Sequence, residues 1–192
     1  MMITDIKQIN IFGKGGHSNV VKNTIEFYPN YNGKVDCYDN DDFSLADDGY
    51  WIIAVGDNLA RRRIFSKLKD KKFISIIHNQ SFCDIVPGIG SQIMKAATIQ
   101  CNVTIKDHTI INTSSSIDHD CKIGSFVHIA PNSTLCGNVS VGDGSFIGAG
   151  SVILPNIKIG NNSIVGAGSV VLNDIGDNKI YIGNPAREKK IN

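Results

Sequence analysis

The sequence predicts a chain of two parts, an α/β unit with a parallel sheet followed by a parallel β-helix of hexapeptide repeats. Two observations predict this fold class. Short apolar strands alternate with helical segments in the first half, and an aliphatic residue recurs at every sixth position from residue 93 to residue 171. A chain of 192 residues can also bury a core without disulfides, in one or two domains.

The alternation in the first half predicts four parallel strands. We expect these strands at residues 8–12, 35–39, 50–55 and 73–77, with helices after the first and the third. The loops that follow the strands should face one crevice, because ligands bind parallel sheets at the carboxyl ends of the strands. About 84 residues supply half of a dinucleotide-binding fold, which favours a mononucleotide or a nucleotide-sugar over NAD as the ligand.

Two segments of this half are candidates for phosphate binding. Gly13–Gly16 joins the first strand to a helix, where backbone N–H groups can bind a phosphate, although a plain tight turn explains the segment equally well. Arg61–Arg63 belongs to the second helix, and we interpret it as a solvated helix face rather than a phosphate clamp.

The second half is defined by its period of six residues. Ile, Leu or Val occupies every repeat position, namely Ile93, Ile99, Ile105, Ile111, Ile117, Ile123, Ile129, Leu135, Val141, Ile147, Ile153, Ile159, Val165 and Val171. The residue four positions later is small or β-branched and is never charged. Such a period fits short strands joined by tight turns, in which three hexapeptides form one coil with the aliphatic side chains inside.

These patterns set the expected domain boundaries, with the junction marked by the turn residues Pro87-Gly88. We expect the α/β domain at residues 1–84, a linker at 85–92, the β-helix at 93–175 and a carboxyl-terminal tail at 176–192.

The composition argues against several classes of protein. The formal net charge is +1, so the chain lacks the basic excess that nucleic-acid binding requires. Hydrophobic residues make up 42% of the chain, which is too many for a disordered protein. The apolar run at residues 51–55 is far shorter than a membrane helix, and a charge appears early at the amino terminus. We therefore expect a cytoplasmic protein with no nucleic-acid or membrane partner.

Histidines of the repeat segment are the candidate catalytic groups. His119 follows the inward Ile117 by two residues, so it should lie outside a coil, and the carboxylates of Asp118 and Asp120 can orient its imidazole. His128 lies half a coil further on and should point to another face, so the two histidines could share a site only if a neighbouring subunit presents one of them. We interpret His108, which fits no such pattern, as a surface residue.

The cysteines do not predict a disulfide framework or a metal site. The chain has five cysteines, and no two have the C-x-x-C spacing. We interpret them as buried thiols in a reducing compartment, and we read Cys121 and Cys136 as packing residues despite their closeness to His119. A zinc hydratase on the same prism would need three histidine ligands, and the three histidines of the repeat segment, His108, His119 and His128, lack a close pair. No metal is expected.

Five segments along the chain form a recognisable set: Ile-Phe-Gly-Lys-Gly-Gly-His at 11–17, Val-Gly-Asp-Asn at 55–58, Ile-Asp-His-Asp-Cys at 117–121, Cys-Gly-Asn-Val at 136–139 and Ile-Gly-Asn-Pro-Ala-Arg at 182–187. With this set the chain resembles, across nearly its whole length, the bacterial nucleotide-sugar N-acetyltransferases of the bacillosamine type. The wider group includes perosamine N-acetyltransferases and sialic acid O-acetyltransferases. The resemblance implies a Rossmann-like amino-terminal half-domain, a left-handed β-helix, and a homotrimer that binds acetyl-coenzyme A in clefts between neighbouring prisms.

The resemblance also implies a role for individual residues. His119 matches the general base, Asp120 the carboxylate that orients it, His128 a second histidine near the acetyl group, and Gly137 a backbone N–H near the thioester carbonyl. The nucleotide-sugar region matches Gly13, Lys14, Gly15, Gly16, His17, Asp39, Asn40 and Asn58. The coenzyme A region matches Gly137, Ala149, Ala167, Pro185, Arg187 and Lys189, with the tail closing the cleft.

The implied reaction is direct transfer of an acetyl group from acetyl-coenzyme A to a nucleotide-linked 4-amino-4,6-dideoxy sugar. UDP is the favoured nucleotide, and the product would serve bacterial surface-glycan or glycoprotein sugar synthesis. The open alternatives are a sialic acid O-acetyltransferase, an N-acetyltransferase of a GDP- or dTDP-linked amino sugar, the zinc hydratase, and a non-catalytic nucleotide-sugar binding module. The sequence names neither the base nor the sugar stereochemistry.

Overall fold

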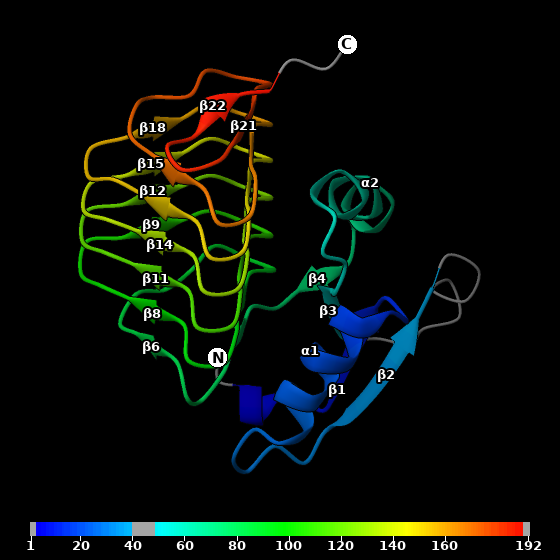
Figure 1. Ribbon diagram of the computed structural model, residues 1–192. Helices are drawn as coiled ribbons and strands as arrows, with labels where there is room; N and C mark the ends of the chain where they lie inside the picture. Colours follow the sequence, from blue (N-terminus) through cyan, green and yellow to red (C-terminus); the bar gives the residue numbers. More distant parts are fainter. Residues whose placement is uncertain (1–2, 40–48, 190–192) are drawn as a thin grey trace.

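The fold consists of a small α/β unit that sits beside a long β-helix (Figure 1). A computed structural model describes residues 3–39 and 49–189. Within these residues, no helix has the length and apolar character needed to cross a bilayer.

The α/β unit is built on one parallel sheet, as the alternation of strands and helices predicts. After a 3-10 turn at Ile3–Asp5, its elements are β1 (Gln8–Phe12), α1 (Gly16–Glu26), β2 (Lys34–Tyr38), β3 (Tyr50–Ile53), α2 (Asn58–Leu68) and β4 (Lys72–Phe73). The strand order is β2-β1-β3-β4. Alternate residues of the central strands face opposite sides, so Ile9 and Ile52 pack with α1 and Trp51 and Ile53 pack with Leu68 of α2.

The β-helix has three faces, each a stack of short strands. The first face contains β5 (Ile76–Ile77), β7 (Gln92–Ile93), β10 (Ile110–Ile111), β13 (His128–Ile129), β16 (Phe146–Ile147), β19 (Ile164–Val165), β21 (Ile180–Ile182) and β22 (Arg187–Glu188). The second face contains β6 (Phe82–Cys83), β8 (Thr98–Ile99), β11 (Ser116–Ile117), β14 (Thr134–Leu135), β17 (Val152–Ile153) and β20 (Val170–Val171). The third face contains β9 (Thr104–Ile105), β12 (Lys122–Ile123), β15 (Ser140–Val141) and β18 (Lys158–Ile159).

One coil contains 18 residues, because paired residues on adjacent coils are separated by that number along the chain. Thus Ile110 pairs with His128, and Ile111 pairs with Ile129. The repeat aliphatic residues fill the interior and form a single buried cluster. The small residues beside them also bond adjacent coils together, since Ser133, Ser145 and Ser151 donate their hydroxyls to backbone carbonyls 15 residues later.

The corners between faces share one backbone conformation. Every sixth residue from 90 to 168 has a positive φ, between 50° and 72°. Asparagine or glycine occupies many of these positions, as this left-handed conformation favours. We call the turns after the first, second and third faces the first, second and third corners. His108 and Phe126 are bulky exceptions at the third corner, with φ of 53° and 56°.

The ends of the β-helix differ from the expected boundaries. β5 and β6 pair with β7 and β8, so the prism begins at Ile76, before the residue 84 at which we expected the α/β domain to end. At the other end, β21 extends the first face beyond residue 175, and β22 folds back against it in an antiparallel pair.

Two sequence interpretations are wrong at the junction between the units, where α2 packs on the third corner. His108 is buried rather than on the surface, with 1% of its area exposed, and its ring stacks on Phe126 at 5.1 Å between centroids. Arg61 is completely buried rather than part of a solvated face. The period of six is the same at all three corners, so the period alone does not reveal which corner a helix covers.

We expect the interior aliphatic positions to determine the stability of the prism. Ile147→Ala should lower the free energy of unfolding by about 2–5 kcal/mol, because the side chain is fully buried. Leu172→Ala is the matched control, since it removes the same number of carbon atoms from a side chain that is 44% exposed. Its cost should be about 0.5 kcal/mol. Urea denaturation measures both, and equal losses would contradict the assigned interior.

Candidate active site

A crevice lies between the carboxyl edge of the α/β sheet and the first face of the prism. Its cavity measures about 870 Å³. The walls include Gly56, Asn58, Leu59 and Arg62 from the β3–α2 segment, and His128, Phe146 and Ile164 from β13, β16 and β19. The expected ligand-binding edge of the sheet therefore opens onto the β-helix.

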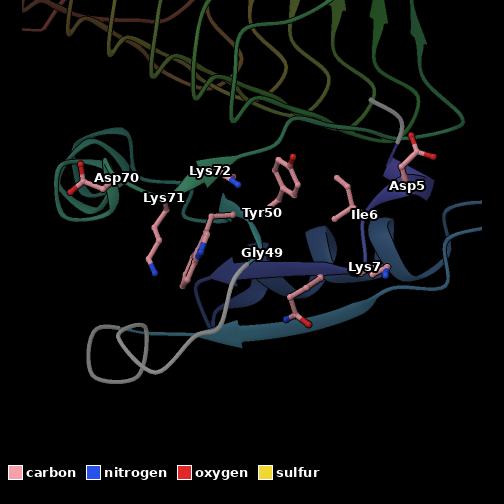
Figure 2. Close-up of a pocket in the computed structure, with 10 residues that line it drawn as sticks. Asp5, Ile6, Lys7, Gly49, Tyr50, Asp70, Lys71 and Lys72 are labelled. Carbon is pink, nitrogen blue, oxygen red and sulfur yellow. The ribbon is translucent and has the colours of Figure 1, made fainter.

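A smaller hollow of about 340 Å³ lies at the opposite, amino edge of the sheet (Figure 2). It is lined by Lys7, Tyr50 and Lys72 among others, and by the carboxylates of Asp5 and Asp70. Parallel sheets bind their ligands at the carboxyl edge. We therefore assign the site to the larger crevice.

Two fixed hydrogen bonds hold His128 in the wall of this crevice. Its Nδ1–H donates to the Gly56 carbonyl at 2.9 Å, and its Nε2 accepts from the Asn112 amide nitrogen at 3.0 Å. These partners assign one neutral tautomer. Burial lowers the pKa of His128 to about 4, so the ring is neutral at pH 7.

His17 lies beside His128, with 6.4 Å between the ring centroids. Gln92 of β7 donates its amide to the Ile53 carbonyl at 2.9 Å, so its oxygen faces His17 and accepts from Nε2–H at 2.8 Å. Burial lowers the pKa of His17 as well. Asn58 completes the group by donating to the carbonyls of Gly144 and Ser145.

The loop after β1 brings the remaining nucleotide-sugar candidates to the same edge. Gly13 has a φ of +135°, and a Cβ there would lie 2.9 Å from the Ala54 carbonyl oxygen, so glycine is required. Gly15 caps α1 without a side-chain hydrogen bond. Lys14 forms an ion pair with Asp39 at 3.0 Å. Asn40 lies outside the described residues.

His119 lies at the second corner, exposed to solvent, and forms a dyad with Asp120. Its Nδ1 lies 2.7 Å from the Asp120 carboxylate. This hydrogen bond, together with the charge of Asp118, raises the pKa of His119 above its ordinary value. The same bond lowers the pKa of Asp120. Since Nδ1–H donates to Asp120, the Nε2 atom of the neutral ring can accept a proton.

Gly137 lies one coil above His119, against its imidazole ring. A Cβ at residue 137 would lie 2.7 Å from both Cε1 and Nε2 of His119, which no side chain can tolerate while the ring stays in place. No backbone hydrogen bond from the Gly137 N–H is found within residues 3–39 and 49–189. The second corner therefore places a base next to a backbone donor.

The other coenzyme A candidates lie on a different edge. Ala149 and Ala167 are exposed at the first corner, one coil apart. Arg187 belongs to β22 of the closing hairpin, with Pro185 before it and Lys189 after it. The second face separates this edge from His119 and Gly137. One chain therefore divides the predicted residues among the crevice, the first corner and the second corner, and His119 and His128 occupy different faces, as their spacing predicts.

Sequence reasoning missed Gln92 and Asn112. Both are polar residues that face outward from the coil, and they lie on or next to first-face strands. Similar polar residues occur on the other faces, so only the docking of the α/β unit distinguishes these two.

Cys121 donates its thiol to the Cys136 carbonyl, and burial raises its pKa to about 11, so it is no nucleophile at pH 7. Within the described parts of the chain, no three His, Cys, Asp or Glu residues cluster as a metal site would need.

We expect Asp120 to control the basicity of His119. Asp120→Asn should lower the pKa of His119, because the carboxylate that stabilises the imidazolium is lost. An NMR titration of the His119 ring measures the change. Asp143→Asn is the control, since Asp143 accepts a backbone hydrogen bond from Ser125 at another corner. An unchanged His119 pKa in Asp120→Asn would contradict the dyad.

Comparison with known proteins agrees with the fold. The model of the bacterial transferase hexapeptide (six repeats) family matches residues 120–155 and 138–173. The acetyltransferase domain of PglB from Neisseria gonorrhoeae is 30% identical over 95% of this chain and 100% of its own, with a TM-score of 0.89.

A second solved structure, PerB from Caulobacter crescentus in complex with CoA and GDP-perosamine, is 32% identical over 95% of this chain and 97% of its own, with a TM-score of 0.85. The PglB domain has also been solved in complex with acetyl coenzyme A, and that structure is 28% identical over 95% of this chain and 99% of its own, with a TM-score of 0.86. The α/β unit and the left-handed β-helix are common to the group. The chain belongs to the bacterial nucleotide-sugar N-acetyltransferases with hexapeptide repeats, and it is an acetyl-CoA-dependent sugar N-acetyltransferase.

Proposed function

We propose that this enzyme acetylates the amino group of a nucleotide-linked 4-amino-4,6-dideoxy sugar, with UDP as the nucleotide. The observation that carries the proposal is the His119–Asp120 dyad packed against Gly137. The dyad supplies a base, and the glycine supplies a donor at the place where an acyl transfer needs one. PerB, which is in complex with a GDP-linked amino sugar, supports a nucleotide-linked substrate and keeps GDP as the second candidate.

The proposed chemistry begins with proton removal by His119. The Nε2 atom takes a proton from the sugar amine as its nitrogen bonds to the thioester carbonyl carbon, and Asp120 stabilises the imidazolium. The Gly137 N–H donates to the oxyanion of the tetrahedral intermediate. The C–S bond then breaks, and His119 returns the proton to the leaving thiolate. No covalent acyl-enzyme is needed, because both substrates are bound together.

The crevice suits the nucleotide-sugar. The first-turn N–H groups of α1 lack a side-chain cap, so a diphosphate can accept from them. His17, Asn58 and His128 then line the path from the nucleotide toward the prism. A free sialic acid would leave the nucleotide part of this crevice unused, which favours N-acetylation of a nucleotide-sugar over O-acetylation.

A complete site requires a second subunit. His119 and Gly137 lie at one corner, while the crevice and the residues proposed for coenzyme A lie on the first face and the first corner. We therefore propose a homotrimer in which the dyad of one subunit enters the crevice of its neighbour. We place it in the cytoplasm, where both substrates are made, and in surface-glycan or glycoprotein sugar synthesis.

A substrate panel tests the function. UDP-, GDP- and dTDP-linked 4-amino-4,6-dideoxy sugars and free sialic acid are each assayed with acetyl-coenzyme A, and thiol release is measured. We expect the UDP-linked amino sugar to give the highest kcat/KM. The rate should rise with pH through the raised pKa of His119, since only the neutral ring accepts a proton. A preference for sialic acid would contradict the proposal.

In the same assay, His119→Ala should lower kcat by about 10²-fold or more while circular dichroism stays unchanged. His78→Ala is the control, because the His78 ring accepts a local hydrogen bond from the Gln80 backbone N–H, away from the dyad. Near-normal turnover of His119→Ala would remove the general base from the proposal.

A further inference from the structure

Arg61 is the buried charge that the proposed chemistry does not use. It lies in α2 and is completely buried. Within the described residues its guanidinium forms no ion pair, and it donates instead to oxygen atoms of the backbone and of one amide. Burial lowers its pKa only to about 9, so the group stays charged at pH 7. Such a cation is costly to bury, and all its donors are satisfied.

The six hydrogen bonds of Arg61 join the two units of the fold. Toward the α/β unit, Nη1 donates to the carbonyls of Val55 at 2.9 Å and Gly56 at 3.2 Å, and Nη2 donates to the Asn58 oxygen at 2.7 Å. Toward the third corner of the prism, it donates to the carbonyls of His108, Phe126 and Val127 at 2.8–3.2 Å. One side chain thus fixes the β3–α2 loop against the β-helix.

Two of these contacts act directly on the crevice. The Gly56 carbonyl accepts from Arg61 and from His128 Nδ1–H together, so Arg61 fixes the acceptor that sets the His128 tautomer. The oxygen of Asn58 is held by Arg61, so its nitrogen must face the prism, where it donates to Gly144 and Ser145. Arg61 therefore supports the orientation of the His128 ring through Gly56, and that of the Asn58 amide directly.

We propose that Arg61 is a positioning residue for acetyl transfer, which holds His128 and Asn58 in the orientations that the nucleotide-sugar requires. The inference rests on the proposed function, because it takes the crevice as the sugar site. The charge of Arg61 also opposes protonation of His128, which keeps the ring neutral. The other titratable or charged groups around His128 are His17 of α1 and, on the cavity wall, Asp57 at the N-cap of α2 and Arg62 within α2.

Arg61→Met and Arg61→Lys separate positioning from a merely structural role. Arg61→Met removes the charge and all the donors, whereas Arg61→Lys keeps the charge but has too few donors for six acceptors. Arg63→Met is the matched control, because Arg63 is an exposed neighbour on the same helix. All variants are measured below their unfolding temperatures, as determined by circular dichroism.

The first readout is an NMR titration of His128, which needs no substrate. In Arg61→Met the pKa of His128 should rise by about one unit or more, because the nearby cation that opposes protonation of the ring is lost. Arg63→Met should leave it unchanged. If the pKa of His128 is the same in Arg61→Met as in the wild type, the proposed hold on His128 is wrong, whether or not the enzyme accepts a nucleotide-sugar.

The second readout is the KM for the UDP-linked amino sugar. We expect an increase of about tenfold or more in Arg61→Lys, with the KM for acetyl-coenzyme A little changed, because charge-assisted hydrogen bonds to Asn58 and the loop are lost. This variant decides the question if Arg61→Met fails to fold. A lower melting temperature with wild-type KM values would show a structural role only and overturn the proposal.

Discussion

The stacking of each residue on the one 18 positions earlier is the constraint on which the rest of this structure depends. Parallel hydrogen bonds between coils impose it on every face, and the interior aliphatic residues keep it in register. Residues that meet at a corner therefore come from successive coils rather than from one stretch of the sequence. His119 meets Gly137 because they are separated by one coil, and Asn102 donates to the Asp120 carboxylate for the same reason. The His119–Asp120 dyad, with Gly137 one coil above it and Asn102 one coil below it, is thus built from regular turns without an inserted loop.

The α/β unit packs on the third corner of the β-helix, and this contact makes the otherwise regular prism asymmetric. Phe126 and His108 adopt the left-handed conformation that costs bulky residues about 1–3 kcal/mol each. Their stacked rings pack against Phe65 of α2, and Phe73 contacts His108. Burial lowers the pKa of His108 to about 4, so the ring can stay neutral inside this contact. The same surface receives Arg61, so the aromatic stack and the buried cation together hold α2 against the third corner.

The sequence predicts the fold because its periods have direct physical causes. Period six identifies the coils, and the alternation of strands and helices identifies the parallel sheet. The dyad was also predictable, since carboxylates flank His119 outside a coil. The errors share one origin, because a single sequence does not show which face of the prism is covered. His108 and Arg61 are therefore buried against expectation, and Gln92 and Asn112 were missed. The positions of the dyad at the second corner and of the crevice at the first face follow from half-coil spacing, and the proposed homotrimer would bring them together.

Mixed oligomers of two inactive variants test most directly whether the site is shared between subunits. His119→Ala subunits lack the base, and His128→Ala subunits lack the second histidine of the crevice. When the two are unfolded and reassembled together in equal amounts, about a quarter of the intersubunit sites should combine an intact His119 with an intact His128. We predict that the mixture recovers activity in about that proportion, while each variant assembled alone stays inactive. A mixture no more active than the sum of the two pure variants would contradict a site formed by His119 of one subunit and the crevice of the next.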